Sequence, residues 1–131
     1  MAAVTFRDET ATGRPVADPW GVEGLPDRMT VRELIRLRVR EEVARYNAGT
    51  GGGRYHGLVR PGATETELNG RRRERQPVVW ERQADIAERA FAANGFFVLS
   101  GDRQVEDLDE VLDLTAGPEL VFIELVPLAG G

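Results

Sequence analysis

Residues 96–131, FFVLSGDRQVEDLDEVLDLTAGPELVFIELVPLAGG, decide the fold. Their order of apolar, polar and small residues predicts a strand, a tight turn, a short acidic strand and a short helical turn at residues 111–114. A final strand follows, in which Val121, Ile123 and Leu125 alternate as the expected buried set. The last residues, Gly130 and Gly131, end a tail that we expect to be flexible from about residue 126.

The start of the chain predicts a hairpin. Residues 4–8 alternate as a strand, and residues 9–13 form a turn with Gly13 as its flexible point. Residues 15–26 contain three prolines, which cannot donate to a ladder, so they are expected to form an irregular edge strand. The residues of this strand that we expect to be buried are Trp20, Val22 and Leu25.

A helix is predicted from Thr30 to Asn47. Thr30 and Glu33 fit a capping box, in which a hydroxyl and a carboxylate satisfy backbone amides at the start of a helix. Apolar residues then recur at helical spacing and form the expected buried face: Leu34, Ile35, Val39, Val43 and Tyr46.

The middle of the chain predicts an insertion and a second helix. Residues 48–76 are polar and rich in glycine, and we expect a flexible insertion there. Residues 77–94 predict a helix that ends at Asn94 and Gly95. Its apolar stripe consists of Trp80, Ala84, Ala87 and Phe91, flanked by Ile86 and Ala90. We expect this helix to cover an open part of the core.

The order of signals in residues 96–131 resembles the second half of ubiquitin and its relatives. The resemblance is carried by the strand that ends at Ser100-Gly101, the polar turn at residues 102–104, Val105-Glu106-Asp107, residues 111–114 and the final glycine pair. The early hairpin and the helix that opens with Thr-Val are similar too, whereas the insertion and the second helix depart from the family. The resemblance implies an α+β, β-grasp fold: one ubiquitin-like domain over residues 1–131, with a mixed sheet around the first helix.

The resemblance also implies where a partner binds. By analogy, Phe97 and Leu99 point inward. Phe96, Val98 and Phe122 then point outward as an exposed apolar patch, which is the usual partner surface of the family. The open alternative is that the second helix covers these three side chains.

The tail carries the chemistry that the resemblance implies. An adenylating partner enzyme would join the Gly131 carboxylate to ATP, and Gly130 lacks a side chain that could block a narrow channel. Pro127 stiffens the exit of the tail, and Leu128 and Ala129 complete it. The chain would need no cofactor of its own. A conjugating enzyme and a deconjugating protease are further expected partners.

Three uses of such a chain stay open. The main expectation is a prokaryotic protein modifier, transferred through a partner cysteine to a target. A sulfur carrier with a C-terminal thiocarboxylate is the first alternative, because the tail lacks the arginines that ubiquitin has there. A non-covalent adaptor is the second alternative. Mass spectrometry of the tail after reaction with an activating enzyme distinguishes them.

Composition argues against several functions. A net charge of −5 argues against a general nucleic-acid binder. No apolar run approaches the roughly 20 residues of a membrane span, and no secretory signal is recognisable, so we expect a cytoplasmic protein. The chain has no Cys and no Lys, so it offers neither a thiol nor an ε-amine of its own. His56 and Ser100 are the only residues of their kinds, and we expect neither a metal site nor an enzyme.

Overall fold

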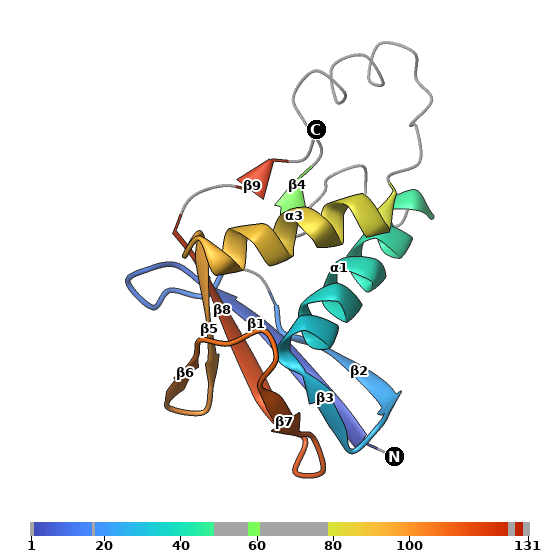
Figure 1. Cartoon of the computed structure of the whole chain (residues 1–131), viewed down its shortest axis with the longest axis vertical. Coiled ribbons are helices and arrows are strands. Elements are labelled where there is room, and N and C mark those ends of the chain that lie inside the picture. Colours follow the sequence, from blue (N-terminus) through green and yellow to red (C-terminus); the bar gives the residue numbers. More distant parts are fainter. Residues whose placement is uncertain (1, 17, 49–57, 61–78, 126–127, 130–131) are drawn as a thin grey trace. The chain divides into compact units, whose positions relative to one another are not determined.

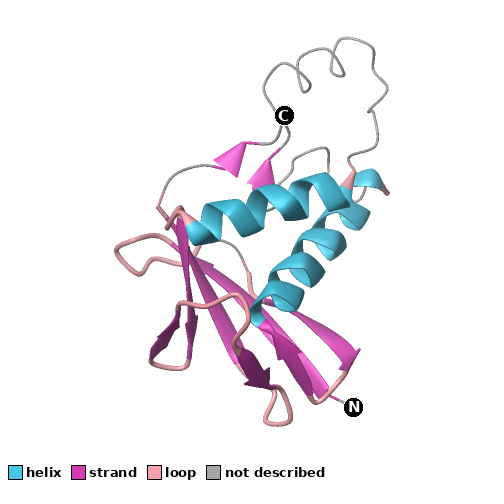
Figure 2. Ribbon diagram, in the orientation of Figure 1, coloured by secondary structure: helices cyan, strands magenta, loops and turns pink. Residues whose placement is uncertain are grey.

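The computed structural model describes residues 2–16, 18–48, 58–60, 79–125 and 128–129. In this part the chain is an α+β protein with a mixed five-stranded sheet and two helices (Figures 1 and 2). The chain divides into two compact units. Unit 1 consists of Met1–Leu34 and Ala90–Val126, and unit 2 of Ile35–Arg89 and Pro127–Gly131. The single domain over residues 1–131 stays a prediction.

The large sheet lies in unit 1 and has the strand order β2-β1-β8-β5-β6 (Figure 1). Its strands are β1 (Ala2–Glu9), β2 (Trp20–Leu25), β5 (Phe96–Ser100), β6 (Arg103–Val105) and β8 (Glu119–Glu124). The central pair, β1 and β8, is parallel, and the other pairs are antiparallel. Strand β8 is therefore hydrogen-bonded to a neighbour on each side.

The predicted first hairpin is confirmed, because β1 pairs with β2 and Phe6 is opposite Trp20. The turn bends at Gly13, whose φ of +87° suits a residue without Cβ. The Trp20 ring packs on Phe6 with centroids 5.0 Å apart. Trp20, Val22 and Leu25 are partly exposed, so the burial predicted for them is incomplete.

The short helical turn predicted at residues 111–114 is wrong. Strand β7 (Val111–Asp113) pairs antiparallel with β3 (Arg28–Thr30), with Leu112 opposite Met29. Each strand has three residues, which is too short for a period of two to show in the sequence. The pairing depends on a partner more than eighty positions away, which the local pattern does not reveal.

Helix α1 (Val31–Asn47) begins as predicted. The Thr30 amide donates to the Glu33 carboxylate at 2.8 Å, and the Glu33 amide donates to the Thr30 hydroxyl at 3.1 Å. This is the reciprocal pairing of a capping box. The apolar face is confirmed for four residues that are fully buried, Leu34, Ile35, Val39 and Val43, while Tyr46 is partly exposed.

Helix α3 (Trp80–Ala92) confirms the second predicted helix over the residues described. Asn94 has a φ of +63°, and the Gly95 amide donates to the Ala90 carbonyl at 2.7 Å. The Asn94 amide donates to the Phe91 carbonyl at 3.1 Å, which completes a Schellman end. Ala84, Ala87 and Phe91 are buried, as the stripe predicted.

The core of unit 1 is a chain of aromatic rings. Phe122 contacts Phe6 and Phe96, with centroids 5.9 Å and 5.8 Å apart, and Phe96 contacts Phe91 at 5.7 Å. These distances are typical of favourable ring pairs, which add to the stability gained by burying apolar area. The last turn of α3 thus supplies one ring to the core of the sheet.

Unit 2 contains most of both helices and two short strands. Strand β4 (Val59–Arg60) pairs parallel with β9 (Leu128–Ala129). Arg38 is buried, at 1% exposure, and its guanidinium lies 3.0 Å from the Glu42 carboxylate. The other oxygen of Glu42 accepts the Leu58 amide at 2.9 Å. Apart from residues 48 and 58–60, the predicted insertion at 48–76 lies outside the described residues.

Candidate functional site

The described part of the tail is paired with another segment. Leu128 is opposite Val59, and Ala129 is opposite Arg60, in a parallel ladder. The sequence predicted a flexible tail and did not predict this pairing. The missed partner is a two-residue strand in the insertion, which has no periodic pattern to find. Pro127, Gly130 and Gly131 lie outside the described residues.

The predicted partner patch is wrong in its residues. Phe96, Val98 and Phe122 are 1%, 1% and 2% exposed, and they form the core of unit 1. Phe91 from α3 packs on Phe96, so the alternative that the second helix covers these side chains holds at Phe96. Since neighbouring residues of a strand face opposite sides, the other set of side chains must face outward.

The outward set forms an apolar surface, here called the outer-face strip: Phe97, Leu99, Val121 and Ile123. Phe97 is directly opposite Ile123, and Leu99 is opposite Val121. All four are partly exposed, although the prediction placed them inward. Leu125, the last of the predicted inward set, is 43% exposed.

Charged side chains border the outer-face strip on the side of β1. Arg7 is opposite Val121, and Glu9 is opposite Ile123. The Arg7 guanidinium lies 3.7 Å from Glu9 and 3.2 Å from Glu119. An apolar strip with a polar border is the common composition of a protein-binding surface.

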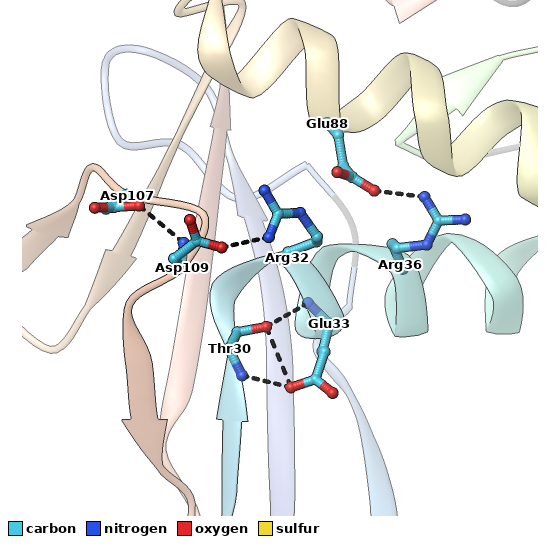
Figure 3. A network of polar contacts seen from close by, with 7 residues as sticks. All are labelled: Thr30, Arg32, Glu33, Arg36, Glu88, Asp107 and Asp109. Carbon is cyan, nitrogen blue, oxygen red and sulfur yellow. Dashed lines mark hydrogen bonds and ion pairs between the residues drawn. The ribbon is translucent and has the colours of Figure 1, made fainter.

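The start of α1 is closed by protein groups. Its first two amides, of Val31 and Arg32, donate to the carbonyls of Glu110 and Leu108, each at 2.9 Å. The Arg32 guanidinium also pairs with Asp109, whose own amide donates to Asp107 at 2.8 Å (Figure 3). Because loop carbonyls occupy these amides, this helix end is not available as an anion site.

Arg36 joins the two helices within unit 2. It pairs with Glu88 (Figure 3), lies 2.9 Å from Asp85, and places its guanidinium 5.5 Å from the centre of the Trp80 ring. The hydrogen bond to Asp85, then that to Glu88, raises the pKa of Arg36 above its ordinary value. The group is charged at any physiological pH, so its role is to hold the helices together.

The described residues contain no cluster of three His, Cys, Asp or Glu side chains that could hold a metal ion. Ser100 is partly exposed, opposite Arg103, and precedes the turn at Gly101, where φ is +63°. This placement agrees with the turn role that its sequence context indicates. His56 lies outside the described residues. None of the helices described is long and apolar enough to cross a membrane.

Comparison of the chain with protein-family models, with curated proteins and with solved structures found no match.

Proposed function

We propose that the chain is a ubiquitin-like protein modifier with a β-grasp fold. The observation that supports this most strongly is the strand arrangement of unit 1. A hairpin (β1, β2) precedes the main helix, β5 lies beside β8, and β8 lies parallel to β1 at the centre of the sheet. The same order of elements in the sequence led to the resemblance to ubiquitin.

The position of β8 suits a protein that is handled by its tail. Strand β8 has β1 on one side and β5 on the other, and residues 125–131 follow it. A force that a partner protein applies to the tail is therefore resisted by the hydrogen bonds of β8 to both β1 and β5. The tail therefore has a firm base, which supports the proposal that other proteins act on it.

The proposed reaction uses partner enzymes and the last residue of the sequence. The Gly131 carboxylate attacks the α-phosphorus of ATP, pyrophosphate leaves, and an acyl-adenylate forms. A partner cysteine thiolate then displaces AMP and forms a thioester. An amine of the target attacks that thioester and releases the thiolate. Gly130 allows the end to enter a narrow channel, because glycine has no side chain.

The partner surface in this proposal is the outer-face strip. It replaces the patch predicted from the sequence, whose three residues are buried. The strip lies on β5 and β8, the two strands that the resemblance placed at the partner surface. An activating or conjugating enzyme would contact Phe97, Leu99, Val121 and Ile123 while the tail reaches its active site.

The pairing of Leu128 and Ala129 adds a step to this proposal. Extended into a channel, the tail cannot keep its hydrogen bonds to β4. The two-residue ladder must therefore open before Gly131 reaches ATP. A ladder of this length opens at low free-energy cost, because each net hydrogen bond contributes about 1 kcal/mol.

Deletion of Gly130 and Gly131 tests the proposal. We expect no adenylation of the truncated chain and normal adenylation of the full chain, measured as pyrophosphate exchange with adenylating enzymes encoded by neighbouring genes. Substitution of Leu125, which is exposed, by alanine is the matched control and should leave exchange unchanged. Circular dichroism shows whether each variant is folded. Normal activation of the truncated chain rules the proposal out.

The same reaction distinguishes the other functions. A protein-sized adduct at the C-terminus supports the modifier. Replacement of oxygen by sulfur in the terminal carboxylate, seen by mass spectrometry, supports the sulfur carrier, which the arginine-free tail favours. An unchanged tail with every activating enzyme tested supports the non-covalent adaptor.

A further inference from the structure

A pocket of about 330 Å³ opens in unit 1 where strand β6 ends. Strand β5 has five residues and β6 has three, and the pair Val98 and Val105 is their last. Beyond this pair, the start of β5 has no β6 residue beside it. The buried rings of Phe91 and Phe96 line the pocket, as do the exposed residues Asn94, Gln104 and Glu106. Because these two rings are buried, the accessible lining of the pocket is mostly polar, and the partly exposed Phe97 also lines it.

Strand β6 is also an edge strand of its sheet within the described residues. Gly101 and Asp102 form a two-residue turn, so Ser100 and Arg103 flank the turn as a hydrogen-bonded pair. Hydrogen-bonded and non-bonded pairs alternate along an antiparallel ladder. The Gln104 amide and carbonyl, in the next pair, therefore point to the open edge, where a further strand can pair with them.

The charge at this edge is acidic. Glu106 is exposed and makes no ion pair with any other described residue. The nearby cation, Arg103, is neutralised by Glu110 at 2.5 Å. A basic side chain that enters the pocket would lay its methylene stem along Phe97, which is partly exposed, and place its charge among polar groups beside Glu106.

We propose that the open edge of β6 binds an extended basic segment of another protein by strand addition. The segment pairs with the Gln104 backbone, and one lysine or arginine side chain occupies the pocket beside Glu106. The short edge contributes few hydrogen bonds, so the pocket supplies the specificity. This site lies at the β6 edge and shares only Phe97 with the outer-face strip, and it does not depend on the proposed modification chemistry.

The test uses the full chain and two blocked pentapeptides with the order valine, threonine, X, threonine, valine. In one peptide X is arginine, and in the other it is citrulline, which has the same shape without the charge. Amide NMR signals are followed during titration. We expect the arginine peptide to shift signals of residues 94–106 and to bind about tenfold more tightly than the citrulline peptide.

Four variants separate backbone pairing from charge recognition. Gln104→Pro removes the outward amide but leaves the β5–β6 ladder, and it should weaken binding about three- to tenfold. Gln104→Ala keeps the amide but also removes the pocket-lining side chain, so the additional weakening in Gln104→Pro measures the backbone pairing. Glu106→Gln should abolish the preference for arginine, whereas Asp102→Asn, an exposed acid in the same hairpin, should keep it. Signals of Val98 and Val105 report whether each variant keeps the ladder.

Several results would overturn this inference. Equal binding of both peptides, or an unchanged preference in Glu106→Gln, removes charge recognition. Unchanged binding in a folded Gln104→Pro variant removes strand addition. Concentration-dependent dimerisation through β6, detected by sedimentation, assigns the edge to a second copy of this chain.

Discussion

Unit 1 and unit 2 are stabilised by different interactions. The described buried side chains of unit 1 are all apolar, and its centre is the ring chain Phe6, Phe122, Phe96 and Phe91. Unit 2 buries the charged side chain of Arg38 and the amide of Gln83, and Arg36 links its helices. The comparison shows that the described interior of unit 1 is entirely apolar, whereas unit 2 also buries polar side chains.

Each unit contains one of the chain's two tryptophans, which allows the two units to be followed separately. Trp20 packs on Phe6 in unit 1, and Trp80 lies against the Arg36 guanidinium in unit 2. In a Trp80→Phe background, fluorescence reports on unit 1, and in a Trp20→Phe background it reports on unit 2. The stability predictions below use these two backgrounds.

The largest effect is expected from Phe122→Ala. Removal of this ring leaves a cavity between Phe6 and Phe96, and we expect the free energy of unfolding of unit 1 to fall by about 4 kcal/mol. Denaturant unfolding, followed by the fluorescence of Trp20, measures this loss of stability. Ile123→Ala, on the outer face of the same strand, is the matched control and should lose about 1 kcal/mol. Equal losses at the two positions would show that both faces of β8 are buried alike.

A smaller effect is expected from Arg38→Met in unit 2. The substitution keeps much of the side-chain volume but leaves the Glu42 carboxylate, itself 10% exposed, without its cation. We expect a loss of about 3 kcal/mol, measured at Trp80. The double variant Arg38→Met, Glu42→Gln should recover most of this loss, because glutamine can still accept the Leu58 amide. No recovery would show that Arg38 acts through packing.

The smallest effect concerns Asp113 in unit 1. The Thr115 hydroxyl and amide donate to its carboxylate at 2.6 Å and 2.9 Å and lower the pKa of Asp113. A lowered carboxyl pKa stabilises the folded state above the unfolded-state pKa, and this contribution is lost as the pH falls through the folded-state pKa. The stability difference between wild type and Asp113→Asn should therefore disappear at acidic pH.

An NMR titration of the Asp113 carboxyl in the folded chain and in the urea-unfolded chain gives the direction of the shift. A pKa of Asp113 that is higher in the folded chain would contradict the prediction. Because Asp113 is exposed, its contact with Thr115 is expected to contribute less to stability than the buried Arg38 in unit 2.

Local signals in the sequence predicted the ends of the helices. The Thr30 and Glu33 pair and the Asn94-Gly95 end involve residues only a few positions apart, and the structure contains both. The face of β5 was not predictable in this way. Each of the four residues Phe96, Phe97, Val98 and Leu99 is apolar, so alternation does not choose between the two faces. The contacts of Phe96 with Phe91 and Phe122 determine which face of β5 is buried.

Sequence reasoning missed three features of the structure. It assigned the outer-face strip to the core because it chose the wrong buried face of β5 and β8. Burial of Arg38 opposes the usual exposure of arginine. The available signal was Glu42, which lies four residues later on the same helix face. The pocket beside β6 follows from the unequal lengths of two strands, which the sequence places only approximately.

Under the proposed function, the parallel pairing of β9 with β4 would make release of the tail an equilibrium. If the ladder contributes about 2 kcal/mol, the docked form outnumbers the released form by roughly thirtyfold. A protein that captures the segment around Val59 and Arg60 would shift this ratio without touching the final glycines. If the proposed modifier function holds, the fraction of chains whose tail can be activated in a cell would then depend on what binds that segment.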